Sequence, residues 1–315
     1  MRILGLHHVT ATVDGAQDDL DFALRVLGLR LVKKTVNFDN HHVFHFYYGD
    51  RVGTPGTIWT TFPYRDQNVR VGAKGAGQVT TTVFSVPVGA LEAWRVRLAS
   101  RGIAADDLAP RFGDPAIGFS DPSGVDFELV GVADARAPWI PAADSARAVE
   151  SDIAIRGLHS VTLTVRDAAP TVAFMTSQLG WRRIDESANR VRMAIGDGGP
   201  ARTIDVVHRA DAPLAVNGLG TVHHVAMAIG SAEEQLALRE RLIAAGAKVT
   251  EVRDRCYFTS IYFREPGGVL FEVATIAPGF TVDEDADALG RGLQLPPWEE
   301  ANRADIEAHL PAIRD

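Results

Sequence analysis

Two pairs of adjacent histidines stand at the head of two similar apolar stretches, and they are the residues best suited to chemistry. The pairs are His7–His8 in "GLHHVTATV" and His223–His224 in "GTVHHVAMAI". Imidazole is a common metal ligand and exchanges its proton near neutral pH. One such pair is typical of a buried hydrogen-bonded network. The recurrence of the pair at one position of two similar stretches favours a shared metal site.

Strand alternation predicts which histidines share a face, because successive side chains of a strand point to opposite sides. In the first stretch Val9 and the apolar residues at alternate positions predict the face that packs on a helix. His8 then points to the opposite, concave side, and the same count places His224 there. Strict alternation turns His7 and His223 the other way unless a bulge intervenes.

A carboxylate in each of two later strands is predicted to point to the same concave side. The stretch "GGVLFEVAT" (267–275) places Glu272 there, and "SGVDFELVG" (123–131) places Glu128 there. A carboxylate within an apolar strand is costly to bury unless it is paired or bound to a metal. Two histidines and one carboxylate on one side of a metal form a facial triad, which suits Fe(II) and leaves positions open for substrate and O2. Mn(II) accepts the same ligands, although Fe(II) is preferred here.

The strands that carry these residues belong to a unit that recurs four times. Each unit begins with a similar strand, continues into a helical pattern that ends near a glycine, and closes with short β-rich runs. The sequence therefore predicts an α+β fold of four βαβββ modules. The predicted modules are 1–64 and 76–131 in a first half (1–131), 154–210 and 219–276 in a second half (153–276), with a linker at 132–152 and a tail at 277–315 that contains a short helix from about Trp298.

The ligand set predicts which modules pair. The concave first-strand positions of modules one to four are interpreted as His8, Gln78, Ser160 and His224. Only modules one and four bring His8, His224 and Glu272 together. We therefore predict that module one pairs with four and module two with three, as two cup-shaped barrels, of which only the first holds a metal.

Composition limits the other classes of function. The chain has 315 residues, a formal charge of -8 and a pI near 5.7, which argues against nucleic acid as a partner. It has no apolar run long enough for a bilayer and no secretory signal pattern. The single cysteine, Cys256, excludes an intrachain disulfide, and together these features predict a cytoplasmic protein. A homo-oligomer stays open, with the linker and tail as candidate surfaces.

Longer motifs resemble a known family. The stretches "GLRLVKKTVNFDN", "YYGDRVGTPGT" and "DRCYFTSIYFREPGGVLFEVAT", together with "GLHHVTATV", resemble the hydroquinone 1,2-dioxygenases, the ring-cleaving branch of the vicinal oxygen chelate superfamily. The resemblance implies Fe(II)- and O2-dependent cleavage of a small aromatic substrate beside a hydroxyl group. It matches the iron ligands to His8, His224 and Glu272. It places five further residues beside the site, which are His7, Thr10, His223, Arg255 and Tyr262.

Two other functions fit the same fold. A glyoxalase-type isomerase or lyase needs a second inward carboxylate, and the last strand of module one (56–64) has none, since its inward positions are interpreted as Thr57, Trp59 and Thr61. A non-catalytic protein that traps an aromatic ligand has no need of a complete triad. The exact aromatic, whether hydroquinone, a chlorinated hydroquinone or catechol, stays open.

Three smaller features receive structural interpretations. The stretch "HHVFH" (41–45) is interpreted as hairpin surface, and Lys33–Lys34 as a solvated strand edge. Arg255 has an alternative as the ion-pair partner of Asp254 or Glu251.

Overall fold

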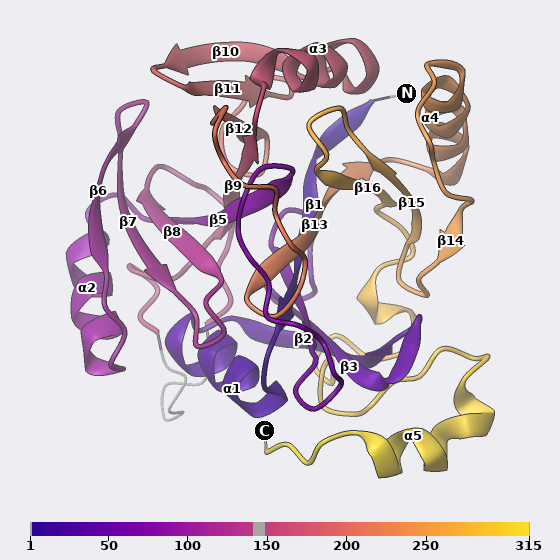
Figure 1. Cartoon of the computed structure of the whole chain (residues 1–315). Coiled ribbons are helices and arrows are strands. Elements are labelled where there is room, and N and C mark those ends of the chain that lie inside the picture. The colour runs from indigo at the N-terminus through magenta and orange to yellow at the C-terminus, as the bar shows by residue number, and fades with distance from the viewer. Residues whose placement is uncertain (1, 141–148, 315) are drawn as a thin grey trace.

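Two eight-stranded sheets form the computed structural model, which describes residues 2–140 and 149–314 (Figure 1). The first sheet has the strand order β14-β15-β16-β13-β1-β4-β3-β2, and the second has the order β10-β11-β12-β9-β5-β8-β7-β6. The first and last quarters of the chain therefore share one sheet, and the two middle quarters share the other. The predicted pairing of modules is confirmed. Positions 141–148 of the predicted linker lie outside the described residues.

The strands of the two sheets have the following bounds. The first sheet contains β1 (Ile3–Val13), β2 (Arg30–Asn37), β3 (Asn40–Gly49), β4 (Ile58–Pro63), β13 (Thr221–Ile229), β14 (Arg253–Asp254), β15 (Thr259–Arg264) and β16 (Leu270–Thr275). The second contains β5 (Gln78–Val86), β6 (Asp106–Arg111), β7 (Asp114–Ser120), β8 (Asp126–Gly131), β9 (Gly157–Val165), β10 (Arg182–Ser187), β11 (Arg190–Ala194) and β12 (Thr203–His208).

One helical segment follows the first strand of each module. The segments are α1 (Ala16–Asp21) continued by the π-helical η1 (Phe22–Val26), α2 (Leu91–Ser100), α3 (Ala168–Leu179) and α4 (Ala232–Ala244). Ser231 caps α4 by accepting a hydrogen bond from the Glu234 N–H at 3.3 Å, because its hydroxyl reaches an N–H that has no partner within the first turn. No helix in the described ranges is long and apolar enough to cross a membrane.

The apolar faces of the first strands lie in one core, as strand alternation predicts. Val9, Val225 and Phe271 are fully buried in it. Phe22 of η1 packs 5.5 Å from the ring of Phe127 in the second sheet, so the two sheets share this core. Their concave sides are left to hold the polar side chains.

Two β-bulges alter the faces of the leading histidines. The antiparallel pairing of β1 with β13 skips His7 on one strand and His223 on the other. Each extra residue departs from strict alternation, so the first histidine of a pair can lie beside the second. The same insertion recurs in the second sheet, where the pairing of β5 with β9 skips Thr80 and His159.

The second sheet corrects one predicted position. Thr81 pairs with Thr162 in the way that His224 pairs with Thr10, so Thr81, not Gln78, occupies the ligand position of module two. Thr80 is the extra residue of a bulge, so counting alternate residues onward from Gln78 does not reach the inward residue Thr81.

Acidic residues on the concave side of the second sheet are neutralised by arginine. Glu128 holds the position of the predicted triad carboxylate and pairs with Arg111 at 3.0 Å. Asp205 pairs with Arg192 at 2.8 Å and with Arg190 at 3.1 Å. Guanidinium groups thus balance the charge of both acids, and the absence of a metal from this cup stays a prediction.

The tail covers the outer strand β2, so the interpretation of Lys33 as a solvated edge residue is wrong. Its side chain is fully buried, and Nζ donates to Asp283 at 2.5 Å and to Glu284. Tyr257 also donates to Asp283, at 3.1 Å. Lys33 therefore holds the tail segment at Asp283 and Glu284 against β2 through buried ion pairs. The local sequence pattern predicts an exposed edge strand here, because the segment that covers it lies some 250 residues later in the chain.

The end of the tail forms short helices, η2 (Phe280–Val282), η3 (Glu300–Asn302) and α5 (Arg303–His309). Phe280 packs among the aromatic side chains under the first cup. In Figure 1, α5 is the yellow helix below the β2–β3 hairpin. The tail is therefore part of the wall around the first cup.

Asp19 is a buried carboxyl in α1. Its Oδ2 accepts hydrogen bonds from Tyr48 at 2.7 Å and Thr61 at 2.5 Å. Burial raises the pKa of Asp19 from 3.8 to about 7. Between these values the folded chain holds a proton that the unfolded chain has released, so the free energy of unfolding falls as the pH rises through that window.

We predict that Asp19→Asn stabilises the protein at pH 8 by about 1–4 kcal/mol, because the amide still accepts both hydrogen bonds and never ionises. The gain should shrink toward pH 5, as urea unfolding at a series of pH values will measure. Asp21→Asn, on the same helix but half exposed, is the control and should shift stability by less than about 0.5 kcal/mol at any pH. Parallel pH curves for wild type and Asp19→Asn would contradict the prediction.

Candidate active site

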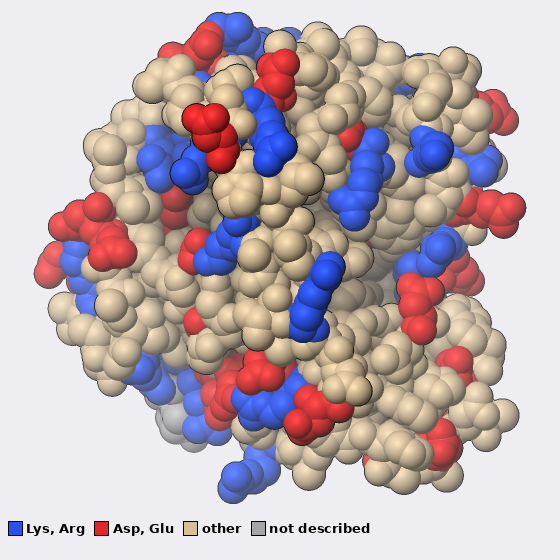
Figure 2. Space-filling view, in the orientation of Figure 1, with Lys and Arg blue, Asp and Glu red and all other residues tan. Residues whose placement is uncertain are grey.

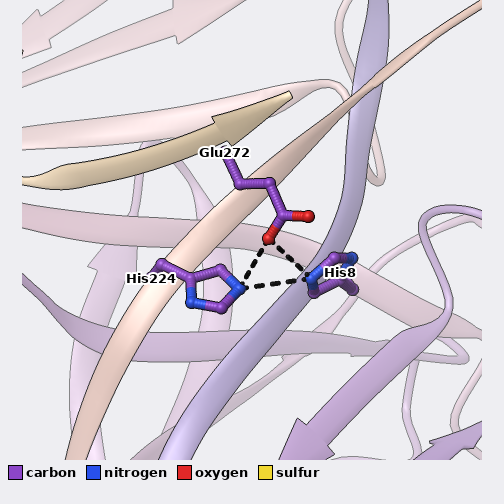
Figure 3. Close-up of side chains that lie close together, drawn as sticks. All are labelled: His8, His224 and Glu272. Carbon is purple, nitrogen blue, oxygen red and sulfur yellow. Dashed lines mark hydrogen bonds and ion pairs between the residues drawn. The ribbon is translucent and has the colours of Figure 1, made fainter. Parts of the chain in front are cut away.

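Three side chains from three strands converge at the centre of the first sheet (Figure 3). His8 lies on β1, His224 on β13 and Glu272 on β16. His8 Nε2 is 3.3 Å from His224 Nε2 and 3.2 Å from Glu272 Oε2, and His224 Nε2 is 2.7 Å from the same oxygen. All three residues are buried. The structure thus brings together the three residues predicted as metal ligands.

The three atoms have the spacing that a metal requires. Bonds of about 2.1 Å at right angles place neighbouring ligand atoms about 3.0 Å apart. The observed separations of 2.7–3.3 Å match three adjacent positions around one ion. The residues present therefore fit a divalent metal.

Electrostatics keep the carboxylate ionised. Glu272 is fully buried, which by itself disfavours the charged form. His8 and His224 nevertheless hold the pKa of Glu272 well below its ordinary value, and Ser260 donates a hydrogen bond to Oε1. Burial lowers the pKa of His224 below its ordinary value, so this imidazole stays neutral at neutral pH. A neutral imidazole and an ionised carboxylate are the forms that bind a metal.

The first histidine of each pair orients the second. His7 Nδ1 lies 2.9 Å from His8 Nδ1, and His223 Nδ1 lies 2.7 Å from His224 Nδ1. Each of these contacts leaves the Nε2 of the second histidine to face the triad. Such outer contacts set ring direction and tautomer in metal sites. The two predicted neighbours His7 and His223 therefore lie beside the site, as the bulges allow.

A cavity of about 220 Å³ opens above the triad. Much of its wall is aromatic. It is lined by His8, Thr12, Asn37, Phe38, Asp39, His45, Tyr47, Phe62, Tyr64, His223, His224, Arg255, Phe258, Tyr262 and Glu272. Pockets for drug-sized ligands measure about 300–1,000 Å³, so this cavity suits a smaller molecule.

Arg255 and Tyr262 form one polar corner of the cavity. Arg255 Nε donates to the Tyr262 hydroxyl at 3.1 Å, and another guanidinium nitrogen lies 3.3 Å from Asp39. Both residues line the cavity, as the family resemblance implies. The ion-pair partner of Arg255 is Asp39, which corrects the alternative partners Asp254 and Glu251. Asp39 lies in the β2–β3 turn, which the sequence does not place near Arg255.

Thr10 lies behind the cavity wall. Its hydroxyl is 3.3 Å from that of Thr60, which in turn contacts His45 Nε2 at 2.6 Å. His45 lines the cavity between Tyr47 and Phe62, with ring centroids 4.0 and 4.2 Å away. The interpretation of 41–45 as hairpin surface is therefore wrong for His45. Its alternation with Tyr47, two positions along β3, is the signal that could have placed it on the inner face.

The inward positions of β4 also differ from those predicted. Thr10 pairs with Thr60 on β4, as Ala226 pairs with Glu272 on β16. Thr60 thus occupies the position of a second carboxylate in module one, while Trp59 is buried in the core between the sheets. β4 therefore has no acidic side chain on either face, and its inward residues are those of the opposite parity to the predicted ones.

Comparison with known proteins agrees with this fold. The model of the Glyoxalase/Bleomycin resistance protein/Dioxygenase superfamily matches residues 157–273. A crystal structure described as a "putative dioxygenase from Bacillus subtilis" superposes with a TM-score of 0.92 and 37% identity over 99% of this chain and 98% of that chain. Glyoxalase I from Zea mays, at 15% identity over 87% of this chain and 92% of that chain, has a TM-score of 0.62 and shares the fold.

Two curated relatives are similar over almost the whole chain. The "Putative ring-cleaving dioxygenase MhqE" of Bacillus subtilis is 40% identical over 99% of this chain and 100% of its own length. The "Chlorohydroquinone/hydroquinone 1,2-dioxygenase" of Sphingobium indicum is 36% identical over 97% of this chain and 95% of its own length. The chain belongs to the ring-cleaving dioxygenases of this superfamily.

The pseudo-symmetry supplies a matched test of the metal site. Loss of a residue that only hydrogen-bonds a metal ligand typically lowers metal affinity by roughly 10–100-fold. We predict that Glu272→Gln, which removes a ligand itself, lowers the affinity for Fe(II) by more than this. Glu128→Gln, at the corresponding position of the second sheet, should bind iron as wild type does. Anaerobic reconstitution followed by iron analysis of the folded proteins measures both. Equal iron content in the two variants would contradict the assignment.

Proposed function

We propose that the protein is an Fe(II)-dependent, extradiol-type dioxygenase that cleaves a hydroquinone-type aromatic ring beside a hydroxyl group and inserts both atoms of O2. The observation that carries the proposal is the donor set of His8, His224 and Glu272 at the floor of a cavity lined with aromatic side chains. A relative that is similar along nearly the whole chain is named for hydroquinone and chlorohydroquinone. We further propose a cytoplasmic location, which the single cysteine supports.

His8, His224 and Glu272 would hold the metal. Imidazole and carboxylate in this ratio suit Fe(II), with Mn(II) as the less favoured alternative. Bound there, Fe(II) supplies redox chemistry toward O2 and lowers the pKa of a substrate hydroxyl. The residues of the chain then have to orient the ring and place protons.

The tautomer of His223 follows from its contact with His224. If Nε2 of neutral His224 binds metal, its proton is on Nδ1, which then donates to Nδ1 of His223. Neutral His223 consequently carries its own proton on Nε2. Burial and the neighbouring His224 lower the pKa of His223 to about 3, which keeps the ring neutral. We therefore propose His223 as a hydrogen-bond donor to an oxygen in the cavity.

Tyr262 is placed to donate a second hydrogen bond. Its oxygen accepts from Arg255 Nε at 3.1 Å, so its own proton is left for a substrate oxygen. Burial and the nearby Glu272 raise the pKa of Tyr262 above its ordinary value, which keeps the phenol protonated. Arg255 adds a positive charge that stabilises negative charge developing on the substrate.

His7 and Thr10 are proposed to act through other residues. His7 contacts His8, and Thr10 contacts Thr60, which holds His45 in the cavity wall. Neither His7 nor Thr10 lines the cavity. We propose both as positioning residues; the family resemblance implies only that they lie beside the site.

The alternative functions have less support from the described residues. An isomerase of the glyoxalase type needs a further carboxylate, and Thr60 occupies that position. A protein that only traps an aromatic ligand gives no reason for an ionised carboxylate facing two imidazoles at 2.7–3.2 Å.

Oxygen consumption tests the reaction. We predict that anaerobically purified protein reconstituted with Fe(II) consumes O2 with hydroquinone, and that His224→Ala abolishes this uptake. Catechol tested in parallel distinguishes the substrate class. Uptake with catechol alone would contradict the hydroquinone assignment but retain the metal site. No uptake with either, despite one bound iron, would overturn the proposed function.

The role of His223 has its own test. We predict that His223→Phe lowers kcat by about 10²–10⁴-fold while iron content stays at the wild-type level, since proton placement by one side chain typically contributes that much. His223→Gln, which keeps an N–H donor, should recover part of the rate. Wild-type kcat in His223→Phe would exclude the role.

A further inference from the structure

A second cluster of metal donors lies where the tail meets the β2–β3 hairpin. His41 and His42 follow the first residue of β3, and Asp305 lies on α5. One donor atom from each residue lies within 4.8 Å of the other two. These residues are separate from the triad of the active site, and the ring-cleaving function leaves them without a role.

The geometry of the hairpin brings both imidazoles to one place. Neighbouring strand residues ordinarily point to opposite faces. The pairing of β2 with β3 is irregular beside the turn at 38–39, and the ring centroids of His41 and His42 lie only 4.5 Å apart. His42 Nε2 is 2.9 Å from Asp305 Oδ2, and His41 Nδ1 is 3.0 Å from Glu299 Oε2.

The two halves of the cluster are held together by other contacts. Ile306, next to Asp305, is fully buried against Val36 and Leu295. The Trp298 ring, next to Glu299, meets the Phe38 ring edge-on at 5.6 Å. Apolar packing therefore fixes the tail beside the hairpin, so a metal would find donors that are already close together and would cost little further ordering.

We propose that His41, His42 and Asp305 form a Zn²⁺ site, with Glu299 as the fourth donor within reach. Imidazole and carboxylate are ligands that zinc binds at about 2.0–2.2 Å, in a tetrahedron that needs donor atoms about 3.3 Å apart. The two measured contacts of 2.9 and 3.0 Å are near that spacing. The side chains of His41 and His42 are 34% and 30% exposed, so they can turn to close the remaining distances, and solvent zinc can reach them.

Zinc at this site would tie the tail to a wall of the active site. The turn between the histidines and β2 carries Phe38 and Asp39, which line the cavity over the triad. Asp39 also pairs with Arg255 at 3.3 Å. A bound zinc ion therefore links α5 to the segment that positions Arg255, and should raise thermal stability.

Zinc binding to the full-length, untagged and metal-free protein tests the proposal. Equilibrium dialysis against micromolar Zn²⁺, followed by metal analysis, should give two equivalents for wild type, one at the triad and one at the tail. The double variant His41→Ala/His42→Ala and the variant Asp305→Asn should each lose one equivalent. Glu307→Gln removes a carboxylate on the same helix that pairs with Arg303, and should retain both.

The two sites fail in distinguishable ways. In Glu272→Gln, which leaves the tail donors in place, zinc should still bind at one equivalent and raise Tm, and adding His41→Ala/His42→Ala should remove both effects. If wild type binds one equivalent that the double variant loses, the tail site stands and the triad assignment fails. Equal zinc content in wild type and the double variant, with an equal Tm shift, would overturn the proposal.

Discussion

The burial of one carboxylate is the constraint on which the centre of this structure depends. Glu272 has no exposure to solvent, and an ionised group in that position is stable only if positive or polar partners surround it. His8 and His224 provide them from strands that are 216 residues apart in sequence. The pairing of β1 with β13 and the two bulges put two nitrogens against that oxygen. Without a cation there, three polar atoms would face one another at the floor of an aromatic cavity.

The second sheet has the same strand arrangement as the first but lacks its two histidines and carboxylate as a set. In the second sheet the carboxylate of Glu128 remains and Asp205 stands at the position of Thr60, but threonine and serine occupy the imidazole positions. Arginine side chains then enter the cup and neutralise the acids. Two copies of the module therefore share a backbone geometry and a buried acid. In one copy the acid faces two imidazoles, and in the other it pairs with a guanidinium group. The function of each cup depends on a few inward positions and not on the fold.

Much of the site could be predicted from the sequence, for a physical reason. Beyond the bulges at His7 and His223, period-two alternation holds along β1, β13 and β16, so the apolar residues of each strand identify the inward residues that alternate with them. Alternation gave the wrong inward residue at Gln78, because a bulge at Thr80 adds a residue to the strand. It gave the wrong face on β4, because the sequence does not fix which residue of that strand faces inward first. His45 was misplaced because the whole stretch 41–45 was interpreted as hairpin surface, although its alternation with Tyr47 marks it as inward. Lys33 was misplaced for another reason, because its partners lie in a tail whose position no local pattern encodes.

The strand order has a consequence for how the protein is made. The second sheet is built from one continuous stretch, 78–208, so all its strands are available for pairing once the middle of the chain has been synthesised. The first sheet needs later parts of the chain, because β1 lies beside β13 and β13 lies beside β16. The ion pairs of Lys33 likewise need Asp283 and Glu284 in the tail. Such distant pairing is slow to form, and domains of a growing chain fold in the order in which they become complete. The cup that contains His8, His224 and Glu272 is therefore the last for which all strands are available, and a chain that ends before β13 lacks two of these three residues.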